Sequence, residues 1–152
     1  MKIGMEYPKA ACLKRSLDQK RLRLAAARAR YYARRAKAEG GVSRISAAPG
    51  HGKADMGAVL ADLADCKTEL DSAERDYTGE TARAKTLLEA IGDPVNGALL
   101  SGVLIGGDKI KTLRCALGMS KQGVYGRAKA ALKQLEDMME AEGYGESRHQ
   151  GT

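Results

Sequence analysis

The side chains that follow Ser120 have the types and the spacing needed to read DNA bases. Lysine can donate hydrogen bonds to the guanine acceptors N7 and O6, and glutamine can form two hydrogen bonds with adenine. Lys121 and Gln122 stand at the start of a helical pattern, and Tyr125 and Lys129 follow at helical spacing. These positions predict a helix that presents its first turns to the major groove.

Positive charge in the same stretch supports this prediction. Residues 109–135 contain seven lysines and arginines and no aspartate or glutamate. A basic stripe of this kind is the usual electrostatic footprint of a DNA-binding surface. Side chains of this stretch that do not reach bases can hold phosphates, which fixes register without reading sequence. The predicted DNA-binding residues are Ser120, Lys121, Gln122, Tyr125, Arg127, Lys129 and Lys133, of which Ser120, Arg127, Lys129 and Lys133 are expected to hold phosphates.

Two short helices joined by a tight turn would position these side chains. Asp108 is expected to cap a first helix that begins at Lys109, because its carboxylate can accept the free amides of the opening turn. Gly118 suits the left-handed residue that ends a helix, and Ser120 can cap the next one. Apolar residues then recur on one face of the second helix, which leaves Lys121, Gln122, Tyr125 and Lys129 pointing outward. The apolar residues are Val124, Ala128, Ala131 and Leu135. Two amphipathic helices with a glycine turn also occur in ordinary all-α cores, and the positive charge favours DNA binding over that alternative.

A third helix is predicted just before this pair. Gly92 can end a preceding helix, Asp93 can cap the next, and Pro94 suits the first helical position, whose amide needs no partner. The following residues, 95–105, are mostly apolar and predict a support helix. The three helices together form a helix-turn-helix module.

Two longer helices are expected upstream. Residues 9–38 contain neither glycine nor proline, and one narrow apolar seam recurs at heptad spacing. Its residues are Ala10, Leu13, Leu17, Leu24, Ala27 and Tyr31. Glu39, Gly40 and Gly41 are expected to end this helix, followed by a loop over about 40–53. A second heptad pattern begins near Ala54 and continues to Ile91. Its seam consists of Met56, Leu63, Leu70, Tyr77, Ala84 and Ile91, with Val59, Cys66, Ala73 and Leu87 as companions.

The charge of the two long segments is opposite. Residues 1–53 contain 14 basic residues and 3 acids, whereas residues 54–92 contain 4 basic residues and 9 acids. Opposite charge favours pairing of the two helices in an antiparallel hairpin, although the same heptads could serve a dimer. The sequence therefore predicts an all-α fold with a helical hairpin over 8–92, a helix-turn-helix module over 93–141 and a disordered tail over 142–152.

Other chemistry finds little support in the residues. Cys12, Cys66 and Cys115 are three single thiols, an odd number that argues against a disulfide framework and favours the cytoplasm. With only His51 and His149, no zinc site can be assembled, and no other cofactor is expected. The APGHGK segment lacks the preceding strand and the Ser or Thr of a phosphate-binding loop. We expect neither an enzyme nor a membrane span.

The segment DKIKTLRCALGMSKQGVYGRAKAALKQL with its support helix resembles the region-four helix-turn-helix of sigma factors. The layout of residues 8–140 is similar to phage and prophage transcriptional regulators of the ArpU and RinA type. Arg114 departs from the pattern, because such modules usually place a small residue there. Either its stem lies outward and Ala116 takes the close contact, or the packing differs. The framework positions that match are Leu113, Leu117, Gly118, Ser120, Val124, Ala131 and Leu135.

The resemblance implies a sequence-specific regulator that binds double-stranded DNA. The hairpin would then serve as an oligomerisation arm, in a homodimer or higher homo-oligomer, or would contact host RNA polymerase. Two other functions stay open. One is a phage DNA-packaging subunit, similar to a small terminase, and the other is a coiled-coil protein that binds nucleic acid without sequence preference.

Overall fold

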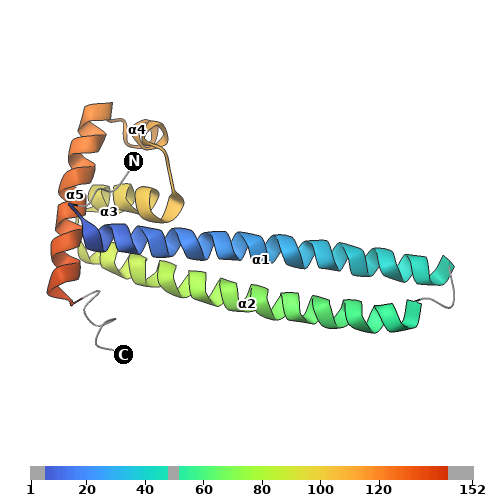
Figure 1. Cartoon of the computed structure of the whole chain (residues 1–152). Coiled ribbons are helices and arrows are strands. Elements are labelled where there is room, and N and C mark those ends of the chain that lie inside the picture. The colour runs from blue at the N-terminus through green and yellow to red at the C-terminus, as the bar shows by residue number, and fades with distance from the viewer. Residues whose placement is uncertain (1–5, 48–51, 144–152) are drawn as a thin grey trace. The chain divides into compact units, whose positions relative to one another are not determined.

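The computed structural model describes residues 6–47 and 52–143, and every regular element in these ranges is helical. This confirms the all-α prediction. In chain order the elements are α1 (Pro8–Ala47), α2 (Gly52–Ala90), α3 (Pro94–Leu100), the π-helical turn η1 (Ser101–Gly106), α4 (Ile110–Leu117) and α5 (Lys121–Ala141) (Figure 1). The chain divides into two compact units. Unit 1 joins the start of α1, through Asp18, to everything from Gly79 onward, and unit 2 is Gln19–Thr78.

In unit 2, α1 and α2 lie side by side and run antiparallel (Figure 1). Arg23 pairs with Asp76, Arg28 with Glu74 and Arg34 with Asp62, so the α2 partner number falls as the α1 number rises. The buried layer between the helices contains Leu24, Ala27, Leu70 and Ala73, with Tyr31 and Tyr77 partly buried beside it. These are the predicted seam positions, and the antiparallel hairpin is confirmed.

Arg23 shows how the basic face of α1 is neutralised by the acidic face of α2. Its Nε lies 2.9 Å from the Glu69 carboxylate, Nη1 donates to Asp76, and Nη2 lies 3.2 Å from the Ser72 hydroxyl. The hydrogen bond and charge of Arg23 hold the pKa of the Glu69 carboxyl below its ordinary value. Within unit 2, much of the positive charge of α1 is therefore used inside the protein.

The predicted end of the first helix at Glu39 is wrong. α1 continues through Gly40 and Gly41 to Ala47, and α2 begins at Gly52, so both helices extend into the predicted loop. Glycine costs only about 1 kcal/mol relative to alanine inside a helix, which does not by itself stop one. Residues 48–51, including His51, and the predicted tail from Tyr144, including His149, lie outside the described residues.

Unit 1 has two apolar clusters, and α5 contributes to both. The first consists of Leu99, Val103, Leu113, Val124 and Ala128, and it joins α3, η1, α4 and the first half of α5. The second packs the other half of α5 across the ends of α1 and α2 (Figure 1). Its buried residues are Ala10, Leu13, Leu17, Ala84, Leu87, Leu88, Ile91, Leu100, Leu104, Ala131, Leu132, Leu135 and Met139.

The corner between α2 and α3 has the predicted caps. Gly92 is the second residue after α2, and it adopts a φ of 80°, which residues with a side chain disfavour. The Asp93 carboxylate accepts the backbone N–H groups of Val95 at 2.9 Å and Asn96 at 3.2 Å. Pro94 occupies the first helical position. The support helix also forms over the predicted range, but its second half is the π-helical turn η1, which periodicity did not predict.

Candidate nucleic-acid interface

α4 and α5 are joined by the tight turn that the sequence predicts. Gly118 adopts a φ of 63° and ends α4, with its N–H bonded to the Arg114 carbonyl. Ser120 caps α5, because its hydroxyl oxygen accepts the Gly123 N–H at 3.1 Å. Three residues, 118–120, separate the helices. The two helices and the support helix share one apolar cluster, which is the architecture of a helix-turn-helix module.

The predicted cap by Asp108 is wrong. α4 begins at Ile110 with Lys109 as its N-cap, and no side chain accepts the amides of its first turn. Asp108 instead belongs to the turn after η1, where its N–H bonds to the Gly102 carbonyl at 2.8 Å. Its carboxylate lies so close to η1 that a Cβ on Gly102 or Gly106 would be 3.0 or 3.1 Å from it. A carboxylate directed back at η1 is unavailable to α4.

The buried and exposed sides of α5 follow the predicted periodicity. The predicted core positions Val124, Ala128, Ala131 and Leu135 all have an exposed fraction of 0%. On another side of the helix lie Lys121, Gln122, Tyr125 and Lys129, which we call the reading face. Its two lysines and Gln122 are exposed, and Tyr125 is partly buried. Polar side chains at the N-terminal end of α5 are therefore accessible to a partner.

The cations around the reading face differ from those of α1 in their surroundings. All seven basic residues of 109–135 are exposed: Lys109, Lys111, Arg114, Lys121, Arg127, Lys129 and Lys133. Among the described residues, only Arg127 of these seven forms an ion pair with a carboxylate. The other six leave a positive surface on α4 and α5 whose charge is available to an acidic ligand.

Arg127 is placed apart from the reading face. Its Nε donates to the Asn96 side-chain oxygen at 3.0 Å, and its Nη2 donates to the Asp93 carboxylate at 3.1 Å. The amides of Asn96 and Val95, and then Arg127, hold the pKa of the Asp93 carboxyl below its ordinary value. Both partners of Arg127 belong to the corner that begins α3, so this guanidinium is engaged inside unit 1.

The suggestion that Ala116 takes the close contact next to Arg114 is wrong. Both side chains are exposed, and neither belongs to the cluster between α4 and α5. Leu113 is the buried residue of α4, and Ile110 and Leu117 pack beside it. Arg114 points outward without disturbing the module, which adds a cation to the surface.

Glu136 has a structural role that the sequence interpretation missed. Only 9% of this residue is exposed, and its carboxylate accepts the backbone N–H groups of Lys9 and Ala10, each at 2.8 Å. Glu136 on α5 thus caps the first turn of α1. One local signal could have revealed it: position 136 lies four residues after Leu132 and three before Met139, in the apolar register of α5. A charged residue in such a register needs a buried partner.

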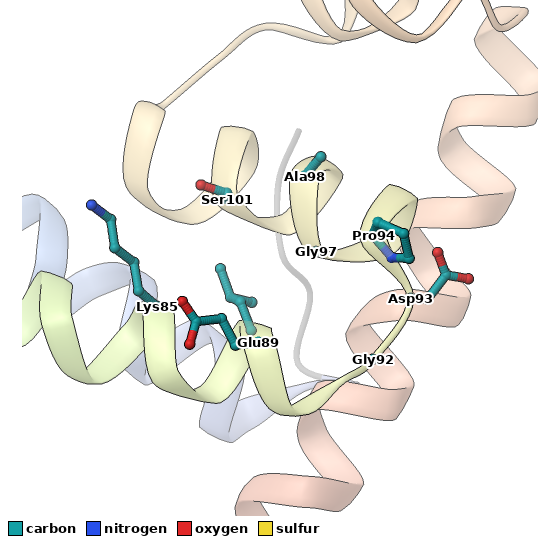
Figure 2. Close-up of a pocket in the computed structure, with 9 residues that line it drawn as sticks. Lys85, Glu89, Gly92, Asp93, Pro94, Gly97, Ala98 and Ser101 are labelled. Atoms are coloured by element: carbon teal, nitrogen blue, oxygen red, sulfur yellow. The ribbon is translucent and has the colours of Figure 1, made fainter.

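A groove lies between the end of α2 and α3, with a volume of 540 Å³. Figure 2 shows Lys85 and Glu89 on the α2 side and Gly97, Ala98 and Ser101 on the α3 side. None of the predicted DNA-binding residues lines it, so it is separate from the reading face. Among residues 6–47 and 52–143, no cluster of side chains has the composition of a metal site, and none of the helices combines the length with the apolar character of a membrane span.

Comparisons with models of known protein families, with curated protein sequences and with solved structures found no match to this chain. The resemblance to sigma factors and phage regulators therefore stays a prediction.

Proposed function

We propose that this chain is a sequence-specific, double-stranded DNA-binding transcriptional regulator of phage or prophage origin. One observation carries the proposal. Three polar side chains of the reading face are exposed within the first nine residues of α5, in a stretch with seven exposed cations and no acid. The three-helix cluster holds that helix end in a defined place. A rigid helix end with lysine and glutamine side chains suits a major groove.

The proposed roles follow from position along α5. Lys121 and Gln122 in its first turn read base edges, lysine on guanine and glutamine on adenine. Ser120, Lys129 and Lys133 hold phosphates and fix the register. The protein acts by binding in the cytoplasm, without a catalytic step or a cofactor. Under this proposal the hairpin is the arm for oligomerisation or for contact with host RNA polymerase.

The test is enrichment of random double-stranded DNA fragments by the purified protein at physiological salt. A double variant, Lys121→Ala with Gln122→Ala, removes the two base-reading side chains. A matched control, Lys37→Ala with Gln19→Ala, removes the same residue types from exposed positions on α1. We expect the unaltered chain and the control to enrich one motif, and the reading-face variant to lose it.

The other outcomes identify the rival functions. Enrichment without any motif, with affinity that falls steeply as salt rises, would replace the proposal with nonspecific binding. A motif bound by a closed ring of many subunits, seen by native mass measurement, would favour a DNA-packaging subunit. A motif bound by a dimer would agree with two half-sites separated by about 34 Å, one helical turn of DNA.

A further inference from the structure

We infer that Arg127 is a positioning residue that sets the rotation of α5 about its own axis, and that it does not contact DNA. This inference rests on the proposed function and assigns a different role to a residue whose type and neighbourhood suggest phosphate binding. Its basis is the combination of a hydrogen-bonded network on one side of α5 and the location of the reading face on another side.

Two α5 side chains, Arg127 and Gln134, form hydrogen bonds with the corner between α2 and α3. Arg127 donates to Asn96 at 3.0 Å and to Asp93 at 3.1 Å. Gln134 donates to the Ile91 carbonyl at 3.3 Å, and its side-chain oxygen lies 3.4 Å from the Asn96 amide nitrogen. Asn96 therefore links the two, and the network joins α5 to residues that are 31 to 43 positions away in the chain.

The corner is itself well fixed, so it can serve as a reference for α5. Asp93 uses its second carboxylate oxygen, Oδ1, to cap α3, and Pro94 restricts the next φ angle. Figure 2 shows the Asp93 carboxylate on the side of the corner toward α5. A planar guanidinium with two acceptors also restrains direction, whereas a lysine would supply a single point of charge.

Helix geometry separates this network from the reading face. At about 100° per residue, Arg127 and Gln134 differ by only about 20° around the axis of α5. By the same measure Gln122, Tyr125 and Lys129 lie about 140–160° from Arg127. A side chain on the network side does not enter the groove that the reading face enters. A small rotation of α5, however, would move Gln122 away from its base edge.

The test separates a positioning residue from a phosphate contact. Arg127→Gln removes the positive charge and the planar guanidinium that bonds two acceptors. Lys133→Gln is the matched control, because it removes a proposed phosphate contact. Asp93→Asn removes the charge that holds Arg127, yet asparagine caps a helix about as well as aspartate. For each variant, the affinity for the enriched motif and for unrelated DNA is measured at several salt concentrations. Circular dichroism confirms at each measuring temperature that the variant is folded.

If Arg127 positions α5, Arg127→Gln and Asp93→Asn both lower the preference for the motif over unrelated DNA, within the roughly 5- to 150-fold that one base contact supplies. Neither changes the slope of log affinity against log salt, whereas Lys133→Gln reduces that slope by about 0.9. If Arg127 holds a phosphate, Arg127→Gln reduces the slope in the same way. Asp93→Asn would then preserve or strengthen binding, because it removes a competing carboxylate. That pair of results would overturn the inference.

A second measurement excludes a merely structural effect. Gln122→Ala is combined with Arg127→Gln and, separately, with Lys133→Gln. Because Arg127 acts through the reading face, Gln122→Ala should cause little further loss of affinity for the motif once Arg127 has been replaced. The losses of affinity caused by Gln122→Ala and Lys133→Gln should instead multiply. Multiplicative effects of Arg127 and Gln122 would contradict positioning. Failure of the unaltered chain to enrich any motif would instead refute the proposed function, and the inference with it.

Discussion

Glu136 shows how one residue can determine where a helix begins. The carboxylate that caps the first turn of α1 comes from α5. Free amides at a helix start attract negative charge, both through direct hydrogen bonds and through the helix dipole. The carboxylate satisfies two of these amides at once and fixes the start of α1 on α5.

Removal of this carboxylate should destabilise the protein measurably. We expect Glu136→Ala to lower the free energy of unfolding by about 1–3 kcal/mol, because partly buried amides lose their acceptor. Glu136→Gln should also destabilise, since its amide group presents a donor to one of the N–H groups. Urea unfolding measures both, and Glu140→Ala, at an exposed position four residues later, is the control. Equal effects of Glu136→Ala and Glu140→Ala would show that the cap does not stabilise the fold.

Asp93 gives the stability a predictable dependence on pH. The amides of Asn96 and Val95, together with Arg127, hold the pKa of its carboxyl below the ordinary value of 3.8. A lowered pKa in the folded state means that the stabilisation is fully present above pH 3.8 and is lost as the pH falls through the folded-state value. The difference in unfolding free energy between the unaltered chain and Asp93→Asn should therefore shrink below pH 3.8. If this difference in unfolding free energy stays constant from pH 7 to pH 2, the stabilisation by Asp93 comes from the shape of its side chain and not from its charge.

At the scale of helices, Gly126 allows helix stability to be separated from the proposed DNA binding. A Cβ at Gly126 would meet nothing within 4 Å, and the same holds for Gly79 in α2. Each glycine-to-alanine change should therefore raise the free energy of unfolding by about 1 kcal/mol.

The two glycines lie on different helices, and only Gly126 belongs to the helix that carries the reading face. Gly126 follows Tyr125 directly on α5, whereas Gly79 belongs to another helix, α2. If the backbone at Gly126 approaches DNA closely, Gly126→Ala should weaken binding although it stabilises the fold, and Gly79→Ala should leave binding unchanged. Thermal unfolding and DNA titration of both variants provide the measurement. Unchanged binding by Gly126→Ala would mean that this glycine only weakens the helix.

The features that sequence predicted well depend on neighbours in the chain. Gly118, Ser120 and Asp93 form their caps with residues at most four positions away, so residue type and order decide them. The apolar side of α5 also follows from local periodicity, and it correctly placed Lys121, Gln122 and Lys129 on an exposed side. Heptads in both long segments, together with opposite charge, were enough to predict the antiparallel pair.

The features that sequence missed depend on distant partners or on weak signals. Glu136 meets Lys9 across 127 positions, and Arg127 meets Asp93 across 34, so no local pattern contains either pair. α1 continues past its predicted end because Gly40 and Gly41 lower helix stability without ending the helix. Asp108 had a suitable type for a cap, but its carboxylate lies against η1 instead.

For the whole molecule, the packing of α5 depends on the start of α1 and the end of α2. Leu100, Leu104, Leu132, Leu135 and Met139 are buried in a cluster that also contains residues of α1 and α2. A fragment of residues 93–152 would lose the α1 and α2 side chains that pack against these five. Each contributes about 1.5–3 kcal/mol when buried, and the sum is comparable to the total stability of a domain, about 5–15 kcal/mol. We expect this fragment to show no cooperative thermal transition.

A shortened hairpin should instead preserve the reading helix. Deletion of 24–30 from α1 together with 70–76 from α2 removes the paired layer of unit 2 and brings Tyr31 and Tyr77 into the places of Leu24 and Leu70. Seven residues are about two helical turns, so both seams keep their register. The shortened chain should unfold cooperatively and enrich the same DNA motif. Cooperative unfolding of the 93–152 fragment, or loss of the motif in the shortened chain, would contradict this dependence.

The cap that Glu136 places on α1 has a consequence for protein synthesis. α1 leaves the ribosome well before α5, and 127 positions separate the two bonded residues. At about 5–20 residues per second, the first turn of α1 remains without its cap for roughly 6–25 seconds. A nascent chain can form its hairpin in that time, but unit 1 closes only after α5 has been made. A chain released before α5 is made would therefore carry the paired helices of unit 2 without a closed unit 1, and cellular quality control could distinguish it from the finished protein.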